Sequence, residues 1–150
     1  MELEKIAESF VLGTLYVETI PSWATDALQT GYDSPSLRQL AGTDVDDHQE
    51  IRDLFQESLR ELGVSLPSPS EAGLSKAKEI ADEIVRGVVT PYVGARTIWT
   101  SIYTRFPDLR ELRPFVGYAS DYEDDEKHRE EYERLIIAES RLLLAEPKTE

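Results

Sequence analysis

The fold is decided by residues 77–99, AKEIADEIVRGVVTPYVGARTIW, which encode two helices and the turn between them. Apolar residues recur every three or four positions before and after the turn, as one buried face of a helix requires. Gly87 can adopt the left-handed conformation that ends a helix. Thr90 and Pro91 then suit the N-cap and first turn of the next helix. These signals predict a helical hairpin over about residues 70–106. The apolar residues of its two stripes are Ala77, Ile80, Ala81, Ile84 and Val85, then Val93, Ala95, Ile98, Trp99, Ile102 and Tyr103.

The same periodicity predicts further helices before the hairpin. An opening helix spans residues 3–16, with Gly13 inside it, and two short helices span 21–31 and 34–42. A longer helix begins at Asp46 or Asp47 and is closed by Gly63. Trp23 falls on an apolar stripe and is expected in the core, as is Trp99 of the hairpin.

The pattern after the hairpin is less regular, because Pro114 and Gly117 interrupt it. We expect one short helix and an irregular stretch there, followed by an acidic run over 121–126 and a final long helix over 132–143. No segment shows the alternation of a strand. The sequence therefore predicts an all-α fold, a single compact domain over residues 1–150 with about seven to eight helices, whose last residues, 146–150, form a frayed tail.

Composition limits the classes of partner and site. The chain has 150 residues and is 40% hydrophobic, enough for one core, and its formal net charge is −14. Such a charge repels nucleic acids and anionic membranes and favours basic partners, or serves solubility alone. With no cysteine and two histidines, thiolate sites are excluded and histidine-rich sites disfavoured. The acidic N-terminus differs from a signal peptide and no apolar run suits a membrane span, so a cytoplasmic protein is expected.

The acidity is concentrated over Asp44–Asp53 and Asp121–Glu133. Acidic blocks are either solvated faces or binding surfaces. Tyrosines beside carboxylates favour the second interpretation for residues 115–126, because rings bury area while acids select a basic partner. The candidate partner-binding residues are Phe115, Tyr118, Asp121, Tyr122, Glu123, Asp124, Asp125 and Glu126, with Asp44, Asp46 and Asp47 as a second cluster.

Metal-binding motifs are incomplete. The segment that begins at Asp44 lacks the glycine of a calcium loop and has Phe55 at the twelfth position, where that loop needs a glutamate. Asp125 and His128 have the spacing of a helical di-iron ligand pair, but a second pair is missing. No nucleophile elbow or phosphate loop is present. We therefore expect no metal, no cofactor and no catalytic residue.

An enzymatic alternative uses the acids of two helices. The pair Glu50-x-x-Asp53 with Glu57, and the pair Glu79-x-x-Asp82, resemble the acidic helix pairs of all-α nucleotide pyrophosphohydrolases. That resemblance implies magnesium held against nucleotide phosphates. Helical geometry places both sets opposite the apolar stripes, and hence toward solvent rather than into a shared cleft.

A second resemblance covers about half of the chain. Residues 23–42, WATDALQTGYDSPSLRQLAG, and 79–99, EIADEIVRGVVTPYVGARTIW, resemble small acidic helical proteins of bacteria, some of which are similar to immunity proteins. The matching positions define a fold and assign no site residue. The resemblance implies a bacterial, cytoplasmic, non-enzymatic adaptor or inhibitor, and the strong acidity favours a basic toxin, such as a nuclease, as its target. A self-associating structural protein is the other alternative, and partner identity and stoichiometry stay open.

Overall fold

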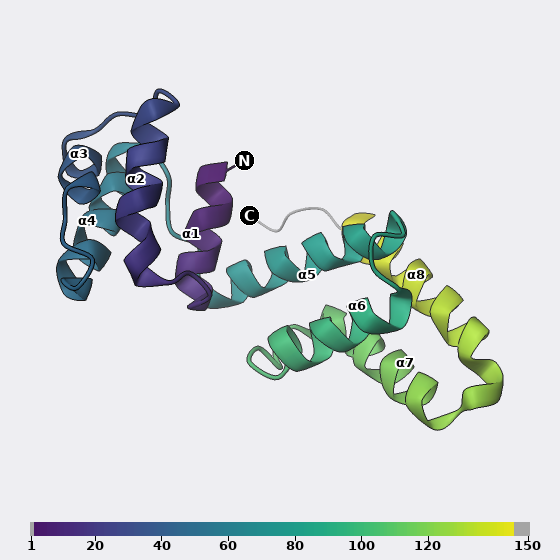
Figure 1. Cartoon of the computed structure of the whole chain (residues 1–150). Helices are drawn as coiled ribbons and strands as arrows, with labels where there is room; N and C mark the ends of the chain where they lie inside the picture. Colours follow the sequence, from purple (N-terminus) through teal and green to yellow (C-terminus); the bar gives the residue numbers. More distant parts are fainter. Residues whose placement is uncertain (1, 146–150) are drawn as a thin grey trace. The chain divides into compact units, whose positions relative to one another are not determined.

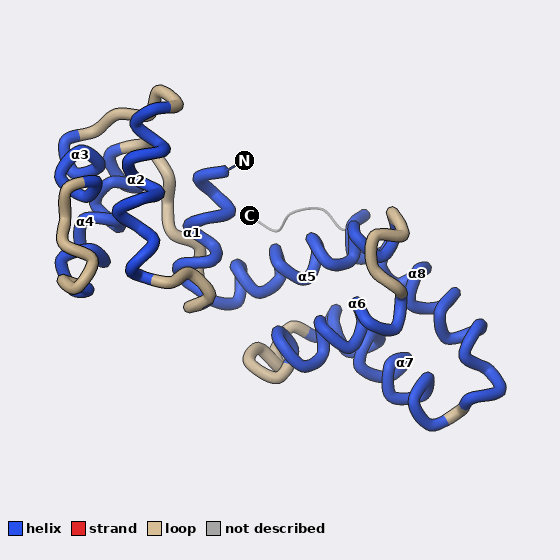
Figure 2. The backbone as a smooth tube through the Cα atoms, viewed as in Figure 1, coloured by secondary structure: helices blue, strands red, loops and turns tan. Residues whose placement is uncertain are grey.

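The computed structural model describes residues 2–145, and these contain eight α-helices and no strand (Figures 1 and 2). The all-α prediction is confirmed. No helix among the described residues has the length and apolar composition needed to cross a membrane. The predicted tail, 146–150, lies outside the described residues. The helices are α1 (Glu2–Leu12), α2 (Ile20–Gln29), α3 (Pro35–Ala41), α4 (His48–Glu61), α5 (Pro69–Val85), α6 (Pro91–Thr97), α7 (Arg113–Asp124) and α8 (Arg129–Ala145).

The chain divides into two compact units, residues 1–72 and 73–150. The sequence predicts one core, whereas the buried residues form two clusters, one within each unit. In the first unit, Ile20 of α2, Leu37 of α3 and Phe55 of α4 are fully buried in one cluster. Phe10 of α1 packs its ring against Phe55, with 4.8 Å between the ring centroids. This contact between two tilted rings therefore joins α1 to the α2–α4 core.

The first unit is fixed locally by caps that the sequence indicates. Ser34 caps α3 by accepting a hydrogen bond from the backbone N–H of Leu37 at 3.2 Å. Glu61, at the end of α4, accepts hydrogen bonds from the backbone N–H and the hydroxyl of Ser36 at 3.0 and 2.7 Å. These bonds lower the pKa of the Glu61 carboxyl, and they join α4 to the first turn of α3.

Most of the predicted hairpin belongs to the second unit, and the first turn of α5 belongs to the first. Ser68 caps α5 by accepting from the N–H of Glu71, whose carboxylate accepts from the N–H of Ser68 in return. Gly87 has a φ of 75° and ends the helical run, as expected. Thr90 caps α6 by accepting from the N–H of Val93. A π-helical segment, η2 (Ile98–Tyr103), extends α6 and buries Ile98 and Ile102.

Two glycines allow close packing inside the second unit. A Cβ built on Gly94 of α6 would lie 2.5 Å from Cγ1 of Ile84 on α5. A Cβ built on Gly73 of α5 would lie 2.7 Å from the ring of Phe106. Both positions need glycine because a neighbouring side chain fills the space that a Cβ would take.

The opening helix is shorter than predicted. Gly13 has a φ of 75°, so it ends α1 instead of lying inside it. Tyr16 consequently falls outside the helix and is 77% exposed. Trp23 and Trp99 are each partly buried and pack against the core of their own unit.

Candidate functional site

The stretch expected to be short and irregular is instead the regular helix α7, preceded by one 3-10 turn, η3 (Arg110–Leu112). Pro114 is tolerated because it lies in the first helical turn, where no N–H is needed. Phe115 is one of the candidate partner-binding residues, but its side chain is 0% exposed in the core of the second unit and is not available at the surface. Tyr118 is half-buried and packs against the same core.

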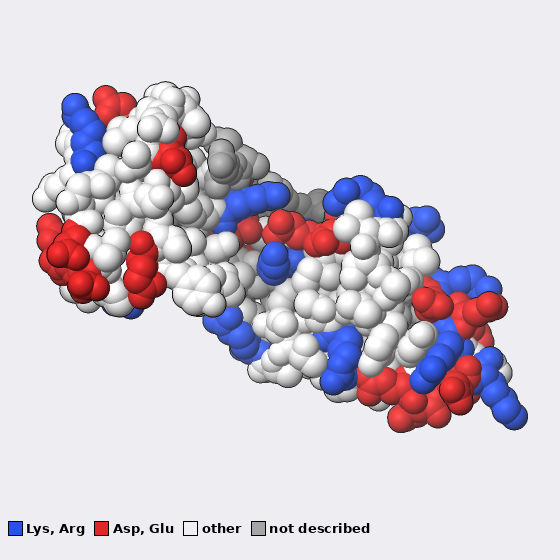
Figure 3. Space-filling model, viewed as in Figure 1, with Lys and Arg blue, Asp and Glu red and all other residues white. Residues whose placement is uncertain are grey.

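The end of α7, the 3-10 turn η4 (Glu126–His128) and the start of α8 form what we call the acidic corner, residues 121–133. It carries eight aspartates or glutamates against one lysine and one arginine. Figure 3 shows acidic side chains gathered at the turn between α7 and α8, with basic ones beside them. The carboxylates of this corner fall into two groups, those bonded within the fold and those that are not.

Glu123 belongs to the bonded group. Its carboxylate accepts a hydrogen bond from the Tyr92 hydroxyl at 2.6 Å and from Arg96 at 2.7 Å. Both donors come from α6, so the residue ties α7 to α6. The carboxylate raises the pKa of Tyr92, because it accepts the proton that ionisation would remove.

Tyr122 is held between an aromatic ring and a guanidinium group. Its ring lies almost parallel to that of Tyr92, with an interplanar angle of 13° and 4.4 Å between centroids. The guanidinium carbon of Arg129 lies 4.7 Å from the Tyr122 ring, and Nε of Arg129 donates to the Tyr122 carbonyl at 3.0 Å. Tyr122 therefore lies at a fixed position beside the acidic side chains.

Asp125 is bonded to the start of α8. It accepts a hydrogen bond from the Tyr132 hydroxyl at 2.9 Å and lies 2.8 Å from Nδ1 of His128. The pKa of the Asp125 carboxyl is lowered, chiefly by the Tyr132 hydrogen bond and next by His128. Its function in the fold is to hold the turn between α7 and α8.

Asp121 and Asp124 belong to the other group. Both are exposed, and neither side chain forms a hydrogen bond or ion pair with the residues described between 2 and 145. They lie in the last turn of α7, which contains no basic residue. A helix C-terminus carries partial negative charge, so acids there are unfavourable. Glu126 follows, 85% exposed, and forms an ion pair with Arg129 at 3.8 Å.

The second predicted cluster has local structural roles. Asp47 caps α4 by accepting from the N–H of Glu50, and Asp44 accepts from the N–H of Asp46 at 2.9 Å. The Asp47 side chain also raises the pKa of the Glu50 carboxyl through a hydrogen bond and charge repulsion. The cluster orders the turn between α3 and α4, and its three aspartates are exposed.

The acids of the enzymatic alternative are engaged along their own helices. Glu57 pairs with Arg60, Asp82 with Arg86 at 2.7 Å, and Glu79 with Lys76 at 3.7 Å. Glu50 and Asp53 belong to the first unit, and Glu79 and Asp82 to the second. Among the described residues, no group of three or more histidine, aspartate or glutamate side chains is placed to hold a metal ion.

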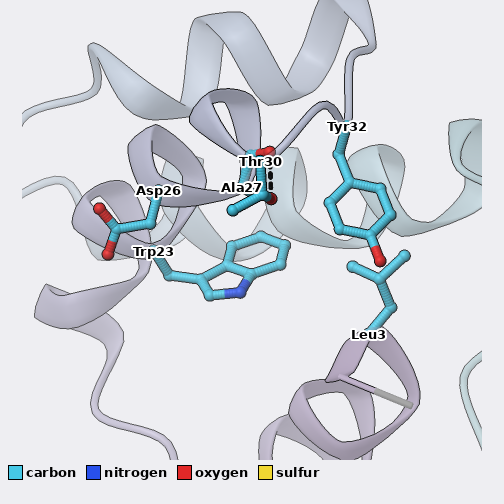
Figure 4. Close-up of a pocket in the computed structure, with 6 residues that line it drawn as sticks. All are labelled: Leu3, Trp23, Asp26, Ala27, Thr30 and Tyr32. Atoms are coloured by element: carbon cyan, nitrogen blue, oxygen red, sulfur yellow. Dashed lines mark hydrogen bonds between the residues drawn. The ribbon is translucent and has the colours of Figure 1, made fainter.

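A small pocket of the first unit has no counterpart in the predicted sites. It has a volume of about 100 Å³ and is lined by Leu3, Trp23, Asp26, Ala27, Thr30 and Tyr32 (Figure 4). Gly31, with a φ of 108°, ends α2, and the N–H of Tyr32 then donates to the Ala27 carbonyl. This turn brings Tyr32 to the pocket. The signal in the sequence is Trp23 with Asp26 three residues later, on one face of a helix.

Comparisons with protein-family models, with curated proteins and with solved structures found no match. The resemblance to immunity proteins therefore stays a prediction.

Proposed function

We propose that this protein is a non-enzymatic, acidic protein-binding module whose acidic corner receives a basic protein partner. In its sharpest form, the proposal makes it a cytoplasmic immunity protein or antitoxin-type inhibitor of a basic toxin such as a nuclease. Carboxylates would steer the basic partner into place and cover its phosphate-binding surface, and the Tyr122 ring would add short-range contact.

The observation that carries the proposal is the placement of Asp121 and Asp124. Their charges lie where the dipole of α7 disfavours them, without a compensating bond among the described residues. The neighbouring acids Glu123 and Asp125 form hydrogen bonds within the fold. These bonds hold the backbone of the acidic corner in place around Asp121 and Asp124. Charges that lower the stability of the fold, at positions held in place by neighbouring bonds, are typical of a binding surface.

Site-specific photocrosslinking in the native host tests the proposal. A photoreactive phenylalanine analogue at position 124 should capture one basic protein, whereas the same analogue at exposed Asp108, elsewhere in the second unit, should not. The captured protein is then purified and its activity as a toxin assayed with and without the unmodified chain. Capture at both positions alike, or of acidic proteins only, would refute the assignment of the acidic corner.

A further inference from the structure

The pocket of Figure 4 is a preformed site with its own chemistry. The Trp23 indole and the Phe55 ring pack in a T-shaped arrangement, with 5.4 Å between centroids and an angle of 70°. Because Phe55 is fully buried, this contact holds the indole in place. In Figure 4 the indole lies between Asp26 and Tyr32, and the Tyr32 hydroxyl points toward Leu3.

The size of the pocket restricts its ligand. The pocket has a volume of about 100 Å³, well above the minimum that holds one water molecule. Pockets for nucleotides or drug-sized metabolites are several times larger, about 300–1,000 Å³. The pocket therefore fits a single side chain better than a cofactor.

The residues that line the pocket favour a ligand with an apolar chain that ends in a positive charge. Leu3 and Ala27 offer apolar contact, and the faces of Trp23 and Tyr32 attract cations. The Asp26 carboxylate forms no hydrogen bond or ion pair within the described part of the chain. The Thr30 hydroxyl donates to the Ala27 carbonyl at 2.9 Å, which leaves its oxygen able to accept. The lining contains no basic residue.

The net charge of the first unit also favours a cationic ligand. Residues 1–72 contain 14 acids and four lysines or arginines, a balance of −10. A field of this sign raises the local concentration of basic groups and repels anionic ones.

We propose that this pocket binds a lysine side chain of a protein partner, with the ammonium group between Asp26 and the Trp23 ring and the methylene stem against Leu3 and Ala27. Lysine fits better than arginine because its compact ammonium on a narrow stem suits so small a volume. The inference rests on the proposed function only in assigning the lysine to the same basic partner.

Nuclear magnetic resonance on the full chain with capped amino acids tests the pocket apart from any partner. The indole N–H signal of Trp23 is identified in a Trp99→Phe variant, since the chain has two tryptophans. N-acetyl-lysine methylamide should shift this signal saturably at millimolar concentration. N-acetyl-norleucine methylamide has the same apolar chain without the ammonium group. Its affinity should be at least about fivefold lower than that of the lysine probe.

Variants separate the pocket from the general charge of the unit. Asp26→Asn should weaken binding of the lysine probe about threefold, the order expected for one exposed ion pair. Asp46→Asn, an equal charge change at an exposed position outside the pocket, should leave it unchanged. No saturable shift, equal binding of norleucine, an unchanged affinity in Asp26→Asn, or tighter binding of N-acetyl-arginine methylamide would each overturn the lysine assignment. None of these outcomes bears on the acidic corner.

Discussion

The Ile84 side chain occupies the space that a Cβ on Gly94 would need, with Cγ1 at 2.5 Å and Cδ1 at 2.6 Å from that position. Ile84 is buried and has little room to move. The two helices of the central hairpin therefore pack at a separation that only glycine permits at this point.

Gly94→Ala should consequently destabilise the protein by about 1–3 kcal/mol, the range for overpacking a core. Gly117→Ala is the matched control, because no atom lies within 4 Å of a Cβ built at that position in α7 and its φ is not positive. The control should gain up to about 1 kcal/mol from higher helix propensity. Chemical denaturation measures both, and equal effects of the two variants would contradict the packing of α5 against α6.

Neutralising Asp121 and Asp124 should stabilise the fold. Asp121→Asn and Asp124→Asn each remove a negative charge from the C-terminal turn of α7 and should raise the free energy of unfolding by roughly 0.3–1 kcal/mol at low salt. Glu123→Gln should do the opposite, since it weakens the bonds to Tyr92 and Arg96. Thermal unfolding at low and high salt measures all three, and a loss of stability in the aspartate variants would show that those acids have a structural role.

The Tyr132 hydrogen bond should make stability depend on pH at the acidic corner. Because the pKa of Asp125 is lower in the folded chain than in the unfolded one, its stabilising contribution is complete above the unfolded pKa and is lost as pH falls through the folded pKa. Tyr132→Phe should raise the Asp125 pKa toward its ordinary value and so reduce the stability that is lost as pH falls. Carboxyl chemical shifts followed through a pH titration measure the change. An Asp125 pKa that is equal in Tyr132→Phe and the parent would rule the hydrogen bond out as its main cause.

Signals between neighbouring residues were enough to predict the hairpin. Most of the candidate sites depend on contacts between residues far apart in the sequence, which such signals do not reveal. Thr90, Pro91 and Gly87 specify caps from neighbouring residues alone, so the sequence suffices for them. The stacking of Tyr92 on Tyr122 joins residues thirty positions apart, which no spacing rule reveals.

One specific prediction failed and another was incomplete, each for a physical reason. The sequence pattern predicts an interruption at Pro114, but this residue lies in the first turn of α7, the helix that buries Phe115. Trp23 was assigned to the core from its apolar stripe, whereas the structure places it on the lining of a pocket as well. Periodicity identifies which face a residue is on, but not whether the packing over that face is complete.

The central claim is that Asp121 and Asp124 steer a basic partner, and the association rate of the photocaptured protein tests it most directly. Stopped-flow mixing should show association at least about tenfold slower for Asp121→Lys/Asp124→Lys at low salt, with the difference largely screened near 0.5 M salt. Glu4→Lys/Asp108→Lys makes the same change in net charge at exposed positions outside the corner and should slow association far less. Equal slowing by both double variants, or none by either, would contradict the claim.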